Sequence, residues 1–187
     1  MVFLLAQSDI PVVIMHINGK PKTMQKNILY SDLIPDIKRF FIKQCDYAIN
    51  SGIKKSNIII DPGIGFGKSF DHNFTLLKRL EDFKDLDFPI LIGPSRKAFI
   101  GDVLNLPSNE RVEGTIATIV AGILNGANII RVHDVKETYQ ALEVYKKYGK
   151  YLPKEEDRTS LTVDAFSKKS DDGAKLACGD RLNYTQE

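Results

Sequence analysis

Four short runs of apolar residues lie within the first 150 positions, and each precedes a longer segment in which apolar residues recur every three or four positions. The runs occupy residues 12–15, 58–60, 90–92 and 129–132. Runs that are apolar at nearly every position are typical of parallel strands covered on both faces, and the segments between them are long enough to return as helices. The pattern therefore predicts a βα unit that is repeated four times.

Residues 35–51 are predicted to form the first of the connecting helices. Pro35 suits a first helical turn, and Gly52 suits the exit. One face of this helix carries the residues expected to pack on the sheet, namely Ile37, Phe40, Phe41, Gln44 and Ala48.

The remaining helices follow from the same spacing. Asp71 is the predicted N-cap of a second helix, whose inner face would carry Phe74, Leu76, Leu77 and Leu80. Two further helices are predicted over residues 116–124 and 135–148, and residues 1–11 resemble the end of a helix that leads into the first strand.

The strand starts lie about 30 to 46 residues apart, close to the module length of an eight-unit (β/α) barrel of about 250 residues. Four units make half of such a barrel, so we expect the chain to begin in the middle of a larger fold. A complete four-stranded parallel sheet with helices on both faces is the competing architecture, because spacing alone does not reject it.

Composition narrows the class of protein. The chain has 187 residues, of which 43% are hydrophobic and 27% charged, as in soluble globular proteins, and the net charge of +2 favours no nucleic-acid partner. It has no apolar run of about 18 residues, and its start lacks the basic flank of a signal peptide, so we expect a cytoplasmic protein without a membrane partner. Cys45 and Cys178 fit no metal spacing and are interpreted as reduced bystanders.

The composition changes near residue 150. Residues 151–187 carry scattered charges and no helical or strand period. Such a segment buries too little apolar surface to offset the entropy of ordering it. We therefore predict one α/β domain over residues 1–150 and a disordered polar tail over residues 151–187.

Polar residues gather where each predicted strand ends. The clusters are Met15-His16, Asp61 with the loop of Gly63, Gly65 and Gly67, Gly93-Pro94-Ser95-Arg96-Lys97, and Arg131-Val132-His133-Asp134. The carboxyl ends of parallel strands share one face, so these groups are predicted to converge on one site.

The residue types at this site indicate a planar heterocycle with an anionic leaving group. Asp61 can accept two hydrogen bonds from an amino-imino edge, and Lys97 can donate to a ring carbonyl. Arg131 can stack on the ring and, with His133, neutralise departing phosphate oxygens.

Each assignment has a simpler alternative. Asp61 could cap its own turn, Lys97 could be a solvated lysine, and His133 could be a neutral core histidine. His16 could be structural, and His72 could cap a helix or face solvent. The three histidines lie on separate elements without a carboxylate at ligand spacing, which argues against zinc.

Four ordered motifs carry a resemblance to a known family. MHINGKPKTMQ, DPGIGFGK, GPSRKAFIG with the downstream RVEGT, and RVHDV are similar in order and spacing to the dihydropteroate synthases of folate biosynthesis, over residues 11–148. The resemblance implies the last four units of a (β/α)8 TIM barrel. It also implies a transferase that joins 6-hydroxymethyl-7,8-dihydropterin diphosphate to 4-aminobenzoate with help from Mg²⁺, whose protein ligand would lie in the first half of the barrel, with no metal ligand in this chain.

The resemblance also implies roles for individual residues. Lys97, Arg131 and His133 would be catalytic, with Asp61 and Lys97 holding the pterin and Arg131 covering its face and touching the diphosphate beside His133. Ser95 would meet the aminobenzoate carboxylate. The pocket would be lined by Met15, Gly65, Phe66 and Gly93.

Two hypotheses from different classes follow. In the first, the chain is the C-terminal half of a dihydropteroate synthase and is inactive without the missing strands. In the second, it is a non-catalytic half-barrel that binds pterin weakly or serves as an interaction module. Open strand edges favour self-association, so a homodimer is included among the expected assemblies.

Overall fold

The computed structural model describes residues 2–19, 21, 24 and 28–149. Its contacts divide the chain into two units, Met1–Glu143 and Val144–Glu187. The fold described below is that of the first unit. The predicted tail over residues 151–187, and Cys178 within it, lie outside the described residues.

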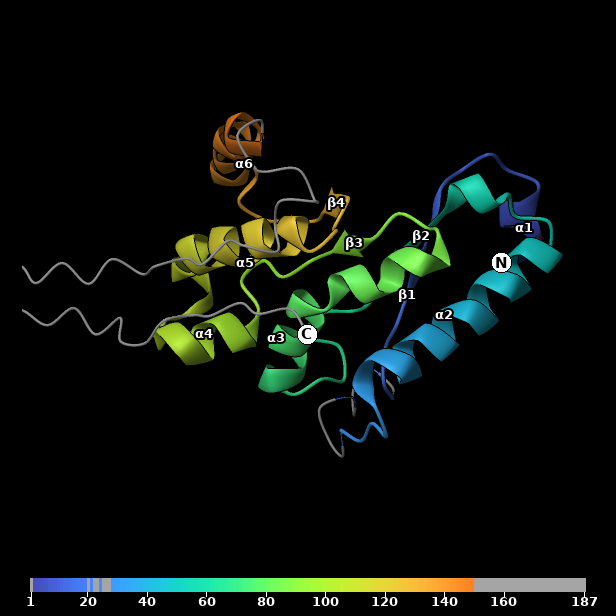
Figure 1. Cartoon of the computed structure of the whole chain (residues 1–187), viewed down its shortest axis with the longest axis horizontal. Coiled ribbons are helices and arrows are strands. Elements are labelled where there is room, and N and C mark those ends of the chain that lie inside the picture. The colour runs from blue at the N-terminus through green and yellow to red at the C-terminus, as the bar shows by residue number, and fades with distance from the viewer. Residues whose placement is uncertain (1, 20, 22–23, 25–27, 150–187) are drawn as a thin grey trace, which may run out of the picture. The chain divides into compact units, whose positions relative to one another are not determined.

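In the described residues, four parallel strands form two two-stranded sheets that a single bridge joins (Figure 1). They are β1 (Val12–Met15), β2 (Ile58–Asp61), β3 (Leu91–Ile92) and β4 (Ile129–Ile130). β1 pairs with β2 and β3 pairs with β4, while a parallel bridge between Ile60 and Ile90 joins the two pairs. The strands therefore follow one another in space in their order along the chain.

This sequential order distinguishes the two architectures that the spacing left open. Right-handed crossovers between successive neighbours keep every helix on one face, as in a barrel, whereas a doubly wound sheet reverses direction at a switch point. Burial agrees, because Ile58, Ile60 and Ile92 are 0% exposed while Val13, at an alternate position, is 46% exposed. The sheet is open, and one of its faces is covered more completely than the other.

Six α-helices and three 3₁₀-helices are present in the described residues. The α-helices are α1 (Val2–Ala6), α2 (Leu33–Asn50), α3 (Phe70–Lys78), α4 (Ala98–Leu104), α5 (Val112–Leu124) and α6 (Val135–Gly149). The 3₁₀-helices are η1 (Lys55–Asn57), η2 (Leu80–Leu86) and η3 (Ser108–Glu110). None of the described helices combines the length and the apolar character that crossing a membrane requires.

The prediction of the first connecting helix, over residues 35–51, is confirmed by α2. Pro35 lies in the first turn of α2, and Gly52 follows the helix with a φ of 98°, the left-handed conformation that glycine adopts without strain. Ile37 and Phe41 are 0% exposed and face the core. Cys45 is also buried there as a free thiol, and burial raises its pKa to about 11.

The predicted N-cap of α3 was wrong. Ser69, not Asp71, caps this helix, and its hydroxyl accepts a hydrogen bond from the His72 backbone N–H, while the His72 ring accepts one from Ser69 N. His72 is thus a capping residue, one of its two expected roles. Phe74 is 42% exposed and packs edge-on against the Phe99 ring of α4, not in the core.

The third unit differs from a simple βα repeat, because two helices, α4 and α5, follow β3. The short α4 was not predicted, since it begins directly after Lys97 and contains Gly101. A Cβ at Gly101 would lie 2.1 Å from Arg111 Cζ, so a side chain there would displace the guanidinium. β4 ends at Ile130, two residues before the predicted end, so Arg131 and His133 lie beyond the strand.

The burial pattern predicts which face of the sheet stabilises the fold. Replacing Ile60 by alanine should lower the free energy of unfolding by about 2–5 kcal/mol, because it leaves a cavity in a packed core. Val13→Ala on the alternate face should change it by no more than about 0.5 kcal/mol. Urea titrations of both variants measure this, and equal losses would contradict the assignment of the core face.

Candidate active site

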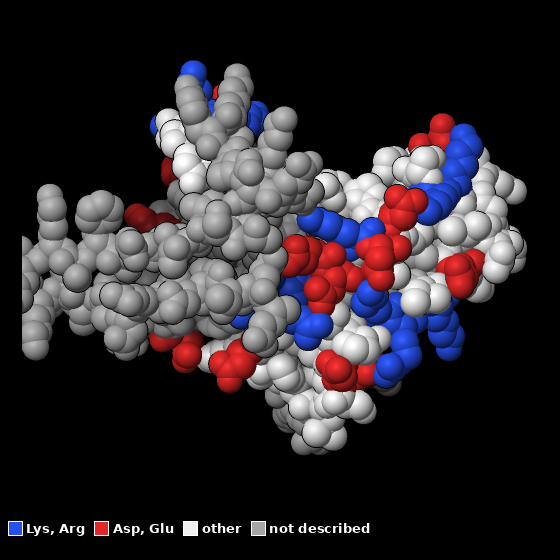
Figure 2. Space-filling view, in the orientation of Figure 1, with Lys and Arg blue, Asp and Glu red and all other residues white. Residues whose placement is uncertain are grey.

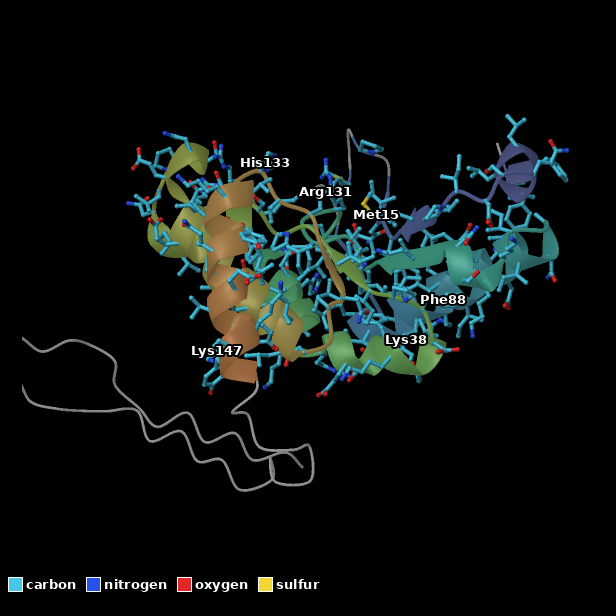
Figure 3. The ribbon with its side chains drawn as sticks, turned by 90° about the horizontal axis from the view of Figure 1, so that it is seen from above. Met15, Lys38, Phe88, Arg131, His133 and Lys147 are labelled. Carbon is cyan, nitrogen blue, oxygen red and sulfur yellow. The ribbon has the colours of Figure 1, made fainter. Side chains whose placement is uncertain are left out.

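The polar clusters gather at the carboxyl ends of the strands. Figure 3 shows Met15, Arg131 and His133 in the upper half of the view, with Lys38 and Phe88 in the lower half. Met15 and Asp61 are register partners in β1 and β2, so their side chains project to the same side. These ends are where a parallel α/β fold places its ligands.

Asp61 is held at the end of β2 with one carboxylate oxygen engaged. The side chain is 8% exposed, and Oδ1 accepts a hydrogen bond of 2.7 Å from Gly63 N. The turn-capping alternative is therefore correct for Oδ1, whereas no described residue donates to Oδ2. Burial raises the pKa of Asp61, and the Gly63 N–H and the charges of Lys68, Lys97 and Arg131 oppose that rise.

The Gly-rich loop after β2 lies against the loop after β1. A Cβ on Gly63, whose φ is 72°, would be 2.0 Å from the His16 carbonyl oxygen, so no side chain fits there. A Cβ on Gly65 would be 3.0 Å from Lys97 Cδ, and Gly65 N donates to Asn73 Oδ1 at 2.6 Å. The side chain of Lys97 therefore packs against the backbone of the Gly-rich loop at Gly65.

Lys97 belongs to this cluster and is not a solvated lysine. Its Nζ lies 4.1 Å from the centre of the Phe66 ring, a cation–π contact. Burial lowers the pKa of Lys97, Asp61 raises it, and Arg131 lowers it further. The charges of Lys97 and Arg131 thus act on the Asp61 carboxylate, and the charge of Asp61 acts on Lys97.

The loop that carries Lys97 is held by residues that the sequence reasoning did not assign. Arg96 has a φ of 59°, and its N–H donates to Thr115 Oγ1 at 3.0 Å. Arg111 Nη1 donates to the carbonyl oxygens of Arg96 and Lys97 at 3.0 and 3.3 Å. The RVEGT segment was the available signal, and its Arg111 and Thr115 support the backbone on which Lys97 stands.

The loops after β3 and β4 are joined by two sets of contacts. Ser95 Oγ, in a residue that is 4% exposed, lies 3.2 Å from His133 N and 3.0 Å from His133 Nδ1. Arg96 and Asp134 form an ion pair, with Nε and Oδ2 3.0 Å apart, which lowers the pKa of Asp134. His133 is exposed, so the core-histidine alternative was wrong.

Lys68 is a buried cation that the sequence reasoning left without a role. The residue is 2% exposed, and its Nζ lies 3.1 Å from His16 Nδ1 and 3.0 Å from the Phe66 carbonyl oxygen. Burial lowers the pKa of Lys68 to about 7, an effect that Asp61 opposes. Burial first and Lys68 second lower the pKa of His16 to about 4, which agrees with a structural role for His16.

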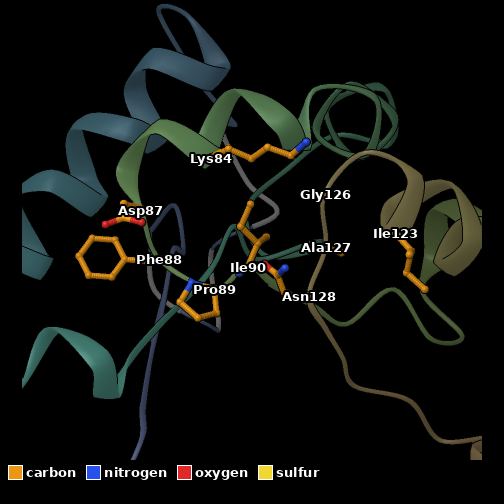
Figure 4. Close-up of a pocket in the computed structure, with 9 residues that line it drawn as sticks. All are labelled: Lys84, Asp87, Phe88, Pro89, Ile90, Ile123, Gly126, Ala127 and Asn128. Carbon is orange, nitrogen blue, oxygen red and sulfur yellow. Dashed lines mark hydrogen bonds between the residues drawn. The ribbon is translucent and has the colours of Figure 1, made fainter. Parts of the chain in front are cut away.

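A cavity of about 560 Å³ lies at the opposite, amino-terminal ends of β3 and β4 (Figure 4). Its walls come from η2, the segment before β3, α5 and the segment before β4, and are formed by Lys84, Asp87, Phe88, Pro89, Ile90, Ile123, Gly126, Ala127 and Asn128. This cavity is separate from the cluster around Asp61, so the predicted shared cavity of the site residues is not the one found here.

The described residues were also compared with two other kinds of site, a charged surface for a polyelectrolyte and a cluster of metal ligands. Acidic and basic side chains are intermixed on the face drawn in Figure 2. Ion pairs such as Lys38–Asp85 and Lys55–Asp87 form among the described residues. Within the described ranges, no group of three His, Cys, Asp or Glu residues could hold a metal ion.

The chain belongs to the family of pterin binding enzymes, whose profile matches residues 1–133. Within it, the chain is 45% identical over 139 residues to the dihydropteroate synthase of Escherichia coli K12, covering 74% of this chain and 49% of that protein. It is 49% identical over 140 residues to the dihydropteroate synthase of Synechocystis, covering 74% and 48%. The chain thus spans about half the length of these relatives.

Solved structures give the same result for the fold, which is of the TIM-barrel family. The dihydropteroate synthase of Yersinia pestis with a sulfonamide drug superposes with a TM-score of 0.77 at 41% identity, over 80% of this chain and 54% of that one. The Thermus thermophilus enzyme in complex with 4-aminobenzoate gives a TM-score of 0.74 at 34% identity, over 78% and 60%. The family expectation from the four motifs is confirmed.

Burial of Lys68 predicts how stability depends on pH. The folded chain loses the Lys68 proton near pH 7, whereas the unfolded chain keeps it until about 10.5, so the free energy of unfolding should rise with pH inside this window. The rise between pH 7 and pH 9 should be about 2 kcal/mol. Cys45, with a pKa raised from 9.0 to about 11, opposes this rise as the pH approaches and passes 9.

Urea titrations at pH 7, 8 and 9 measure this rise. Lys68→Met should abolish it, and Lys43→Met, which removes an exposed lysine of α2, should leave it intact. A flat profile for the unmodified chain would show that the ammonium of Lys68 is hydrated in solution.

Proposed function

We propose that this chain is the part of a dihydropteroate synthase that binds the pterin and the leaving diphosphate, and that it corresponds to the last four βα units of a (β/α)8 barrel. The observation that carries the proposal is the arrangement of Asp61, with Oδ2 free of donors among the described residues, beside the cations Lys97 and Arg131. The family membership and the identities of 45% and 49% with dihydropteroate synthases support it.

The pterin ring would be bound by hydrogen bonds along one edge and by packing contacts on one face. Asp61 Oδ2 would accept hydrogen bonds from the amino-imino edge of the ring, and Lys97 would donate to the ring carbonyl. Phe66 already lies beneath Lys97 Nζ and would line the pocket together with Met15. The glycine at position 65 keeps the backbone close to both.

The chemistry would be a substitution at the methylene carbon of the pterin. The bond from this carbon to the diphosphate oxygen breaks, a bond to the nitrogen of 4-aminobenzoate forms, and the nitrogen loses a proton. Arg131 and His133 would stabilise the charge on the departing diphosphate, and no protein nucleophile is required. Ser95, which bonds to His133, would also meet the carboxylate of 4-aminobenzoate, so it links the two substrate sites.

Other parts of the proposal rest on the family relation. Mg²⁺ would assist the departure of diphosphate, but the described residues do not form a site for it, and no step above is assigned to it. Its protein ligand is therefore proposed to lie outside this chain. We also propose that the protein is cytoplasmic and that it can assemble as a homodimer.

The alternative is a non-catalytic half-barrel that binds pterin or a protein partner. The open sheet favours it, because Val13 on the less covered face is 46% exposed. The two functions differ in one respect that can be measured, since only the enzyme turns over once the remaining strands are supplied.

Turnover distinguishes the two functions. The 187-residue chain alone should give no dihydropteroate above the blank, because positioned groups from the rest of the barrel are absent. A chimera of residues 11–149 with the first half of the Escherichia coli relative should incorporate radiolabelled aminobenzoate. Lys97→Ala should abolish this turnover, and an inactive but folded chimera would contradict the enzyme hypothesis.

Binding tests the role of Asp61. Asp61→Asn in the chimera should weaken pterin binding by about 1.5–3 kcal/mol, since a charged acceptor of two hydrogen bonds is lost. The affinity for aminobenzoate should change little, and Asp71→Asn on the exposed side of α3 serves as the control. Calorimetric titration measures both affinities, and an unchanged pterin affinity would remove Asp61 from its role.

A further inference from the structure

Lys68 occupies a position where a charged side chain is costly. Burying an ammonium group is unfavourable unless it is paired, and an apolar residue of similar size is often as stable or more stable. Lys68 is nevertheless 2% exposed. A buried cation beside the proposed pterin site, without a role in the chemistry above, calls for an explanation in terms of the site.

The ammonium group of Lys68 lies where two loops meet. It bonds to the Phe66 carbonyl oxygen of the Gly-rich loop at 3.0 Å and to His16 Nδ1, just after β1, at 3.1 Å. A Cβ built on Gly63 would be 3.4 Å from Nζ, so the cation also lies against the peptide whose N–H donates to Asp61.

We propose that Lys68 is a positioning residue for pterin binding, which ties the loop after β1 to the loop after β2 and holds Phe66 and the ionised carboxylate of Asp61 in place. This inference rests on the proposed function, because it deepens the account of the same site. Lys68 would not touch the pterin itself.

The first part of this role is mechanical. By bonding to the Phe66 carbonyl oxygen, Lys68 fixes the residue whose ring lies 4.1 Å from Lys97 Nζ. Asn73 and Tyr30 hold the same loop at other points, through Gly65 N at 2.6 Å and the Gly67 carbonyl oxygen at 2.9 Å. These supports are neutral, so they can replace part of the mechanical role of Lys68 but none of its charge.

The second part is electrostatic. Burial favours the protonated, neutral form of Asp61, whereas the positive charge of Lys68 favours the carboxylate that accepts hydrogen bonds from the pterin edge. The other charged groups that act here are Lys97 and Arg131 on Asp61, and Asp36 of α2, which acts on His16. Lys97 and Arg131 would be engaged by substrate, which leaves Lys68 as the structural counter-charge among these cations.

The experiment follows the carboxylate of Asp61 directly. In the 187-residue chain, the ¹³Cγ resonance of Asp61 is titrated for the unmodified protein, Lys68→Met, Lys68→Arg and the exposed control Lys43→Met. Lys68→Met should raise the Asp61 midpoint by about one pH unit or more, with Lys68→Arg intermediate and Lys43→Met unchanged. The Phe66 amide resonance should also shift in Lys68→Met.

Pterin binding is the second measurement. Lys68→Met should weaken the affinity for the pterin diphosphate about tenfold at pH 7, with a smaller loss at higher pH, where Lys68 loses its proton and Asp61 ionises without help. Unfolding by urea at pH 7 should show Lys68→Met to be at least as stable as the unmodified chain, which separates positioning from folding. If Lys68→Met does not fold, Asp61→Asn should instead lower the midpoint of the Lys68 ammonium, because the coupling is reciprocal.

The outcomes separate this inference from the proposed function. An unchanged Asp61 midpoint and an unchanged Phe66 resonance in a folded Lys68→Met chain would overturn the role of Lys68, whatever the affinity for pterin. Absence of pterin binding to the unmodified chain and to the chimera would overturn the proposed function, while the two resonances would still decide whether Lys68 positions Asp61.

Discussion

The close approach between the backbone of Gly63 and the carbonyl group of His16 is the contact on which the site depends. No residue with a side chain could make it, since a Cβ at Gly63 would be 2.0 Å from that oxygen. The contact brings the ends of β1 and β2 together, and Lys68 closes the space beneath them. Asp61 and Phe66 take their places from this junction, and Lys97, held by its own loop after β3, lies against Gly65 and Phe66.

Much of this arrangement was predictable from the order of apolar runs. Because parallel strands end at one face, Asp61, Lys97 and Arg131 could be assigned to one site before their distances were known. The strand β2 and the helix α2 also formed where they were predicted, because β2 is a continuous apolar run and α2 repeats its buried residues every three or four positions. For an element that packs on one neighbour, the spacing of apolar residues predicts both the type of element and its buried face.

Other features depended on contacts that have no local pattern. The helix α4 packs its Gly101 against the Arg111 guanidinium, which lies ten residues further along the chain. The buried Nζ of Lys68 bonds to His16, which lies 52 positions earlier. In α3, Ser69 and Asp71 are both ordinary capping residues, and only the reciprocal bond with His72 decides between them. Sequence spacing cannot rank such long-range or competing interactions.

The sequential order of the strands has a consequence for how the protein is made. Each of β2, β3 and β4 pairs with the strand that left the ribosome just before it. A chain of this topology can add one βα unit at a time, and each new strand finds its edge already formed. Among the strands from β1 to β4, none has to wait for a distant partner to be synthesised, so this part can assemble in the direction of translation.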